Sequence, residues 1–154
     1  MKFEARIQWL DHGRILAECG PMRLIIAAWQ GRVPQKDACI RAARQGVSLL
    51  EQAARYRGIL STRRTNVPDG LDSFLAEKMI RCTAAVGGGL TPMAAVAGAI
   101  ADGVADWLED RGMTKVIVNN GGDIAIRTLP DEPVRVGLRP DLATSPITDS
   151  ITLE

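Results

Sequence analysis

The sequence has few of the residues that build metal-bound or disulfide-stapled domains. Among its 154 residues there are one histidine and three cysteines. His12 alone cannot form a histidine-based zinc cluster, and we assign it no chemistry. Cys19, Cys39 and Cys82 lack the even number and the CxxC spacing of a disulfide or zinc framework. Residues 1–8 also lack the apolar stretch that directs export. These absences favour a reduced, cytoplasmic setting.

Aromatic residues are also scarce, at 4% of the chain, whereas glycine occurs 15 times. The core must therefore be built from Ala, Val, Ile and Leu, with backbones packed closely together. The hydrophobic share of 46% and the charged share of 24% are typical of folded globular chains. A chain of this length forms one domain, over residues 1–154, and buries roughly 70% of its unfolded surface.

One uncharged stretch is long enough to raise the question of a membrane span. It covers residues 82–101, but the glycines at 87–89 and the pair Thr91-Pro92 interrupt it, and most of it is Ala and Gly. The sequence therefore predicts no contact with a membrane.

Charge is distributed unevenly along the chain. Residues 32–64 hold eight basic and two acidic groups, whereas residues 65–154 hold seven basic and thirteen acidic groups. One interpretation is a solvated helix face whose acidic counterpart lies in the same fold. The other is an anion site, for instance for phosphate, with Arg63 and Arg64 at its edge. Nucleic acid is disfavoured, because no basic stripe interleaved with aromatics is present.

The apolar pattern predicts an α+β fold in which antiparallel strands pack with three helices. The first thirty residues alternate as a β-meander, with turns at residues 11–13 and 20–21. Helical periodicity follows over residues 34–58, 71–86 and 91–108. The third helix opens at Thr91, whose hydroxyl can cap it, with Pro92 in the first turn. Further strands are predicted at residues 115–118, 124–126 and 134–138.

The last residues alternate as one more strand, through Ile147, Asp149, Ile151 and Leu153. This strand could be an ordinary chain end that pairs inside a sheet. Alternatively the domain is incomplete at its C-terminus and is the N-terminal portion of a longer protein, or is completed by a second polypeptide. We favour the incomplete domain.

The glycines at residues 87–89 lead into a helix, where backbone N–H groups and bare backbone favour an anion. The spacing is neither that of a P-loop nor that of a dinucleotide fingerprint. Two interpretations stay open: a loop needed for tight helix packing, or contact with a ligand.

The segment 116–126, with the sequence VIVNNGGDIAI, is more informative. Asn120-Gly121 between two apolar runs indicates a β-hairpin. A hairpin does not by itself require Gly122, Asn119 and Asp123. We interpret these residues as groups that contact a polar ligand: the backbone of Gly122, the amide of Asn119 and the carboxylate of Asp123.

The string NNGGDIAI resembles the Asn-x-Gly-Gly-Asp-Ile motif of the ApbE superfamily, and GGGLTPMAAVAGAIAD resembles its glycine-rich loop and following helix. Both segments are most similar to an uncharacterised bacterial and archaeal branch related to ApbE. The resemblance covers residues 85–140. It implies an ApbE-like fold related to the T-fold, in which ApbE proteins hold FAD and use Mg²⁺ to transfer FMN onto a Ser or Thr of a target protein.

The resemblance also implies roles for individual residues. Gly121, Gly122 and Asp123 would line a flavin-nucleotide pocket, and the backbone from Gly88 to Thr91 would lie near the diphosphate or the metal. The candidate cofactor-binding residues are therefore Gly88, Gly89, Thr91, Asn119, Asn120, Gly121, Gly122 and Asp123. The transferases take metal ligands from a Thr-Ser-Gly region after the next strand. This chain has only Ala-Thr-Ser-Pro at residues 143–146, so its catalytic and metal-binding residues stay unassigned.

Three other residues could carry chemistry. Asp102 and Asp106 lie four apart on the third predicted helix and could bind a metal, but solvated carboxylates are the favoured interpretation. Cys82 could be a nucleophile in sulfur chemistry. No charge that would lower its pKa is visible, so a small buried hydrophobe is favoured.

Two hypotheses from different classes follow, and a third is weaker. The first is an ApbE-like protein that binds FAD or a related nucleotide, with Mg²⁺-dependent FMN transfer in a complete chain. The second is a catalytically silent relative that binds a small anionic ligand. The third is a sulfur-metabolism protein that uses Cys82. The expected partner is a small nucleotide or other anion, and a homo-oligomer or a complementing second polypeptide is also expected.

Overall fold

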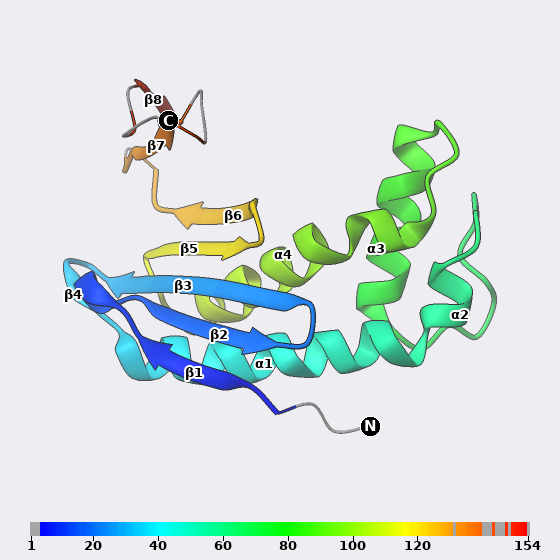
Figure 1. Cartoon of the computed structure of the whole chain (residues 1–154), viewed down its shortest axis with the longest axis horizontal. Coiled ribbons are helices and arrows are strands. Elements are labelled where there is room, and N and C mark those ends of the chain that lie inside the picture. Colours follow the sequence, from blue (N-terminus) through cyan, green and yellow to red (C-terminus); the bar gives the residue numbers. More distant parts are fainter. Residues whose placement is uncertain (1–3, 131, 140–142, 144–146, 148, 154) are drawn as a thin grey trace.

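The computed structural model describes residues 4–130, 132–139, 143, 147 and 149–153. It is an α+β arrangement (Figure 1). The strands are β1 (Arg6–Trp9), β2 (Ile15–Cys19), β3 (Met22–Gln30), β4 (Val33–Pro34), β5 (Lys115–Asn120), β6 (Asp123–Thr128), β7 (Val134–Leu138) and β8 (Asp149–Leu153). The helices are α1 (Lys36–Arg55), α2 (Arg57–Leu60), α3 (Phe74–Val86) and α4 (Val96–Glu109), with 3₁₀ turns η1 (Asp11–Gly13) and η2 (Pro92–Ala95).

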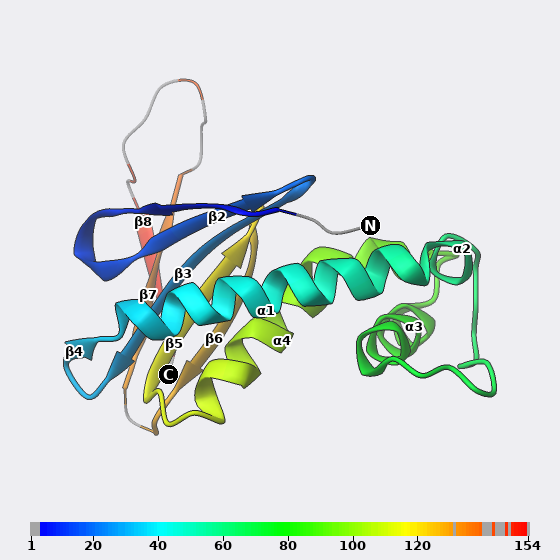
Figure 2. The ribbon, with the colours of Figure 1, turned by 90° about the horizontal axis from the view of Figure 1, so that it is seen from below.

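The main sheet is antiparallel, with strand order β1-β2-β3-β5-β6, and the short β4 pairs with the end of β3. The predicted β-meander is confirmed in β1, β2 and β3. α1 and α4 run along the same face of this sheet, and α1 extends past the sheet toward α2 and α3 (Figure 2). The helical layer therefore has one part that covers the sheet and one part that does not.

Strand β3 lies at the centre of the core. From Met22 to Ala28, every second residue of β3 is apolar and faces the helices, as do the residues of the neighbouring strand β5 that pair with Ile26 and Ala28. Met22, Leu24, Ile26 and Ala28 are all buried, as expected for the face of a strand that packs on helices. In β5, Val116 and Val118 continue the same layer, opposite Ala28 and Ile26. The core is aliphatic, as the scarcity of aromatics predicts.

The first predicted helix is divided in two. α1 ends at Arg55, and Tyr56 separates it from the short α2. The described residues thus contain four helices rather than three. The periodicity of apolar residues could not reveal the break, because the buried Ala53 and Leu60 keep helical spacing on both sides of it.

Two helix starts differ from the predictions. α3 begins at Phe74 rather than Leu71, because the Ser73 hydroxyl accepts a hydrogen bond from the Ala76 N–H at 3.2 Å and caps the helix. Thr91 makes no side-chain cap. The segment after it opens instead as the 3₁₀ turn η2 with Pro92 in its first turn, before α4 begins at Val96.

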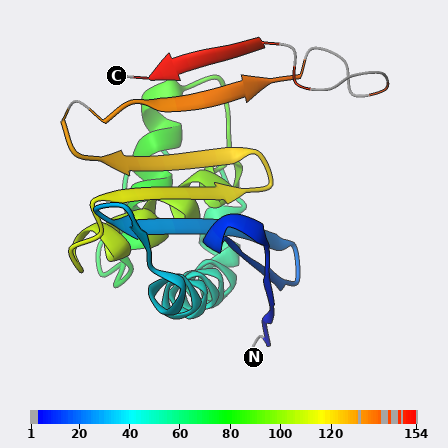
Figure 3. The same cartoon turned by 90° about the vertical axis from the view of Figure 1, so that its left-hand side faces the viewer.

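The strands predicted near the C-terminus are confirmed, and they pair with each other. β7 and β8 form a two-stranded antiparallel sheet separate from the main sheet. Figure 3 shows this pair beyond β6. The partner of the 149–153 strand is thus β7 of the same chain.

Within the described part of the chain, no helix is long and apolar enough to cross a membrane. The uncharged stretch at 82–101 is divided among α3, the glycine loop, η2 and α4.

Glycine in the middle of α1 provides a test of how closely this helix packs on the sheet. A Cβ at Gly46 would lie 2.5 Å from Leu24 Cδ1 and 3.4 Å from Val104 Cγ2. We expect Gly46→Ala to lower the free energy of unfolding by about 1–3 kcal/mol, because overpacking outweighs the better helix propensity of alanine. Urea unfolding measures this change. Gly58→Ala is the control, since a Cβ there meets no atom within 4 Å. An unchanged or raised stability in Gly46→Ala would contradict the close packing.

Candidate functional site

The β5–β6 connection is a two-residue hairpin loop. Asn120 pairs with Asp123, so Gly121 and Gly122 are the loop residues, with φ of 63° and 115°. Such hairpin turns require positive φ at both central positions, which glycine adopts without strain. The idea that a hairpin does not need the second glycine was wrong: the turn itself accounts for both.

The two asparagines beside the turn bond to the protein itself. The Asn119 Oδ1 accepts a hydrogen bond from the Gly122 N–H at 2.9 Å and so stabilises the turn. Asn120 is buried. Its Nδ2 donates to the Ala97 carbonyl at 3.1 Å, and its Oδ1 accepts from the Arg23 N–H at 3.4 Å. Asn120 therefore joins β5 to both β3 and α4.

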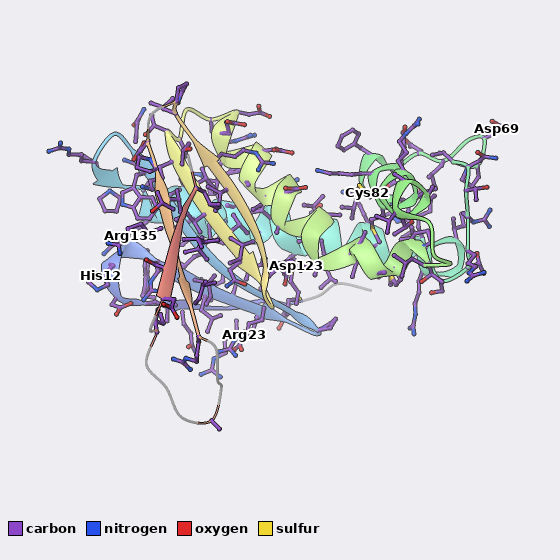
Figure 4. All side chains as sticks on the ribbon, turned by 90° about the horizontal axis from the view of Figure 1, so that it is seen from above. His12, Arg23, Asp69, Cys82, Asp123 and Arg135 are labelled. Atoms are coloured by element: carbon purple, nitrogen blue, oxygen red, sulfur yellow. The ribbon has the colours of Figure 1, made fainter. Side chains whose placement is uncertain are left out.

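Asp123 lies across from Asn120 in the register, and therefore on the side of the sheet that α4 covers. A Cβ at Gly98 would lie 3.7 Å from Asp123 Oδ2, which places the carboxylate beside the first turn of α4. Figure 4 shows Asp123 at the end of the sheet and Cys82 apart from it, on α3. Asp123 is exposed and belongs to neither of the cavities described next.

A cavity of about 570 Å³, the hairpin cavity, lies beside Asn120. It is formed where the β2–β3 turn, the end of α1, α2 and the beginning of α4 meet. Its lining is Pro21, Met22, Leu50, Ala53, Ala54, Arg57, Met93, Val96, Ala97, Ile100 and Asn120. Its volume lies within the range of small-molecule sites, and its lining is mostly apolar with few polar groups, as such sites require.

Arg57 is the one charged residue of the hairpin cavity lining. It is exposed, and it forms no ion pair with the described residues. The sequence analysis counted Arg57 in the basic region but did not place it at a site. The charge pattern was the available signal, whereas the break after α1 and the assembly of this cavity from distant segments were not visible in the sequence.

A second cavity of about 370 Å³, the arginine cavity, contains the other glycine segment. Its lining is Arg63, Arg64, Thr65, Thr83, Ala84, Gly87, Gly88, Gly89 and Leu90. The glycines have φ of 72°, 66° and 80°. A Cβ at Gly87 or Gly88 would meet no atom within 4 Å, so these two residues are not needed for tight helix packing. Their left-handed backbone is what favours glycine.

The two cavities share no lining residue. Of the residues predicted to bind a cofactor, Gly88 and Gly89 line the arginine cavity and Asn120 lines the hairpin cavity. Thr91, Asn119, Gly121, Gly122 and Asp123 line neither. The two glycine motifs therefore belong to different places on the protein.

Asp102 and Asp106 have partners that neither sequence interpretation included. Arg127 Nη2 lies 2.6 Å from Asp106 Oδ1 and 3.2 Å from Asp102 Oδ1, and Lys78 Nζ lies 2.9 Å from Asp102 Oδ2. These ion pairs hold α4 against β6 and α3. Burial raises the pKa of Asp102, but the hydrogen bonds from Lys78 and Arg127 outweigh it and leave that pKa lowered.

No group of three or more His, Cys, Asp or Glu that could hold a metal ion occurs among the described residues. Residues 144–146 of the Ala-Thr-Ser-Pro segment, which differs from the Thr-Ser-Gly region of the transferases and precedes the last strand, lie outside the described residues. The described side chains therefore form no cluster that would hold Mg²⁺ without oxygens from a bound ligand.

The cysteines differ in their surroundings. Cys82 is exposed, so the expectation of a small buried hydrophobe was wrong for it. It lies on α3 and lines neither cavity. Burial raises the pKa of the Cys39 thiol to about 11, which keeps it protonated and unreactive. His12 is exposed in the 3₁₀ turn η1 and has a φ of 54°.

Comparison with known proteins places the chain in a family. The sequence model of a family described as "AbpE bacteria" matches residues 7–154, so the chain belongs to that family. This agrees with the resemblance of NNGGDIAI to ApbE-like proteins at the family level.

Curated relatives are archaeal proteins named "UPF0280 protein". The one from Methanospirillum hungatei is 54% identical over 50 residues, which are 32% of this chain and 20% of the relative. Those from Methanoregula boonei and Methanosphaerula palustris are 43% identical over 68 residues and 42% over 77 residues. These matches cover 44% and 50% of this chain but 27% and 30% of the relatives. The matched part of the chain thus spans less than a third of each relative's length.

The turn geometry predicts different responses at the two hairpin glycines. Asparagine tolerates the left-handed φ of 63° at Gly121, but not the φ of 115° at Gly122. We expect Gly121→Asn to change the free energy of unfolding by less than about 0.5 kcal/mol. We expect Gly122→Asn to lower it by about 1–3 kcal/mol. Urea unfolding compares them, and equal losses would show that the turn does not set the need for glycine.

The ion pairs of Asp102 predict a pH dependence. Its lowered pKa means that the folded state favours the carboxylate, so its contribution to stability is present above about pH 4 and is lost as the pH falls through the lowered pKa. Asp102→Asn should lower the free energy of unfolding by about 1 kcal/mol or less at pH 7, since the group is partly exposed.

At pH 3 the difference between wild type and Asp102→Asn should be smaller. Urea unfolding at the two pH values measures it. Asp110→Asn is the control, because Asp110 is exposed and makes no ion pair with the described residues. A destabilisation by Asp102→Asn that grows at low pH would contradict the ion pairs.

Proposed function

We propose that this protein binds a flavin nucleotide, with the flavin ring in the hairpin cavity, as a member of the wider ApbE superfamily with a T-fold-related architecture. The observation that carries the proposal is the composition of this cavity. It is lined by apolar side chains from five segments, with Asn120 from the motif NNGGDIAI at one side and Arg57 at its surface.

The apolar lining fits a flat ring rather than a free ion. Met22, Leu50 and Ile100 provide aliphatic contact area, and apolar ligand surface gains free energy when it leaves water. Asn120 uses one amide N–H on the Ala97 carbonyl. A side-chain amide has a second N–H and further acceptor capacity, which would orient the polar edge of the ring.

Arg57 supports a nucleotide rather than a neutral ring. Its guanidinium is exposed and free of ion pairs with described carboxylates, so it is available to a phosphate group. A ligand with an apolar body and one anionic end matches this lining. FMN has that character, and FAD carries its diphosphate between the ribityl chain and the adenosine, whereas riboflavin has only the ring and the ribityl chain.

We propose binding and derive no transfer step. When bound, Mg²⁺ would supply Lewis-acid chemistry at the diphosphate, but the described carboxylates Asp102 and Asp106 are engaged by Arg127 and Lys78. The catalytically silent binding protein is therefore the form of the proposal that the described residues support.

FMN transfer, a cytoplasmic location and a homo-oligomer or complementing polypeptide stay predictions. No observation favours sulfur chemistry at Cys82.

Filling the cavity tests the site. We expect FMN and FAD to bind the purified protein, measured by quenching of flavin fluorescence, and Ala54→Phe to weaken binding more than about tenfold, or 1.4 kcal/mol. Ala54 is exposed on α1 and lines the hairpin cavity, so a larger side chain there occupies the cavity without entering the core. Ala85→Phe is the matched control, because Ala85 is exposed on α3 and lines neither cavity.

The role of Arg57 is tested with two ligands. Arg57→Gln should weaken FMN binding about tenfold, since it removes a charged hydrogen bond, and should leave riboflavin binding unchanged. Arg55→Gln removes the same charge two residues away and should change neither. Absence of flavin binding, or equal losses in Ala54→Phe and Ala85→Phe, would overturn the proposed function.

A further inference from the structure

We infer that the arginine cavity is a second ligand site, which binds a phosphate or diphosphate group. It is separate from the hairpin cavity in every lining residue. The inference concerns the Arg63 and Arg64 guanidiniums, so it does not depend on whether the hairpin cavity takes a flavin.

The charges at this cavity are not balanced by the protein. Arg63 and Arg64 both line it, and no acidic residue does. Within the described chain neither guanidinium lies within 4.0 Å of a carboxylate, whereas Arg81 on the neighbouring α3 is paired with Glu77. Two guanidiniums at one cavity repel each other, and an oxyanion between them would remove this repulsion.

Both arginines are held through one nitrogen, which leaves the others free. Arg63 Nε donates to the Gly89 carbonyl at 2.6 Å, and Arg64 Nε donates to the Ile59 carbonyl at 3.3 Å. The terminal Nη groups make no hydrogen bonds to the described residues. A guanidinium fixed in this way presents its remaining N–H groups in a planar fork that matches phosphate oxygens.

Glycine at position 89 is required for this arrangement. A Cβ there would lie 1.3 Å from Arg63 Nη2, so any other residue would displace the guanidinium. The N–H groups of Gly88 and Gly89 bond to no backbone or side-chain acceptor in the described part of the chain. Exposed backbone donors next to two cations add to the attraction for an anion.

The remaining lining indicates the class of ligand. Thr65 is exposed and carries a hydroxyl, whereas the Thr83 hydroxyl donates to the Met79 and Ile80 carbonyls. The few apolar residues, Ala84 and Leu90, offer little area to a ring. Two cationic forks, backbone N–H groups and one hydroxyl match the oxygens of a phosphoryl group. The group could come from free phosphate or diphosphate, or from the end of a larger phosphorylated molecule.

The test uses inorganic diphosphate, phosphate and sulfate as probes, with the affinity measured by isothermal titration calorimetry on the whole chain. We expect diphosphate to bind more tightly than sulfate. Arg63→Gln/Arg64→Gln should weaken diphosphate binding about a hundredfold, since each substitution removes a charged hydrogen bond worth about tenfold. Arg41→Gln/Arg44→Gln is the matched control. It removes the same charge from exposed positions on α1 that line neither cavity, and should change the affinity less than about threefold.

Further variants distinguish specific binding by the guanidinium groups from general attraction by positive charge. They also distinguish a loss of binding from a loss of folding. Arg63→Lys/Arg64→Lys keeps both charges but loses the forks, and should bind diphosphate with intermediate affinity. Circular dichroism of each variant checks that it is folded. If the glutamine pair unfolds, Arg64→Gln alone, expected to lose about tenfold, takes its place.

The outcomes also distinguish this site from the proposed flavin site. Ala54→Phe should leave diphosphate binding unchanged, and Arg63→Gln/Arg64→Gln should leave riboflavin binding unchanged. ADP that binds like diphosphate would indicate a nucleotide as the source of the phosphoryl group, and much weaker ADP binding would indicate the free anion. Absence of diphosphate binding, or equal losses in the Arg63/Arg64 and Arg41/Arg44 pairs, would overturn the inference.

Discussion

The close contact of α1 and α4 with each other and with the sheet is the constraint on which the other features depend. It requires glycine where the backbones meet: a Cβ at Gly46 would lie 2.5 Å from Leu24 Cδ1, and one at Gly103 would lie 2.8 Å from Leu49 Cδ1. With α1 fixed in this way, its C-terminal end projects past the sheet (Figure 2). The arginine cavity lies in this region, between the residues after α2 and the end of α3, whereas the hairpin cavity lies at the edge of the sheet, where Met22 of β3 and Asn120 of β5 meet α1, α2 and α4.

Most of the fold could be predicted from the sequence, because local patterns determine it. Alternation placed β1 to β3, and helical spacing placed α1, α3 and α4. The predicted helix boundaries were wrong where a helix breaks or begins as a 3₁₀ turn without a change in the spacing of apolar residues. The break at Tyr56 that creates α2, and the 3₁₀ turn before Val96, depend on tertiary contacts that periodicity does not record. The Ser73 cap was visible in the sequence as a residue type, but the earlier Leu71 fitted the apolar pattern equally well.

The candidate site was predicted less well, since the same residue types serve structure and function. Gly121 and Gly122 are explained by the hairpin turn, and Asn119 stabilises that turn. Arg63 and Arg64 could be predicted as part of an anion site, because an excess of basic residues over a short stretch of sequence remains a positively charged region in the folded protein. Arg57 could not be placed, because its cavity is formed by segments far apart in the sequence. The pairing of Asp102 with Arg127 is likewise a contact between distant segments.

The β7–β8 ribbon has a consequence for how the molecule opens. Its strands form a ladder only with each other among the described residues, whereas every strand of the main sheet except the short β4 belongs to a continuous row. A two-stranded ribbon has little stability of its own in water. Amide hydrogens of β7 and β8 would therefore exchange with solvent through local opening, while those of β3 and β5 would exchange only when the whole domain unfolds. Ribbon and body would then be two cooperative units within one chain.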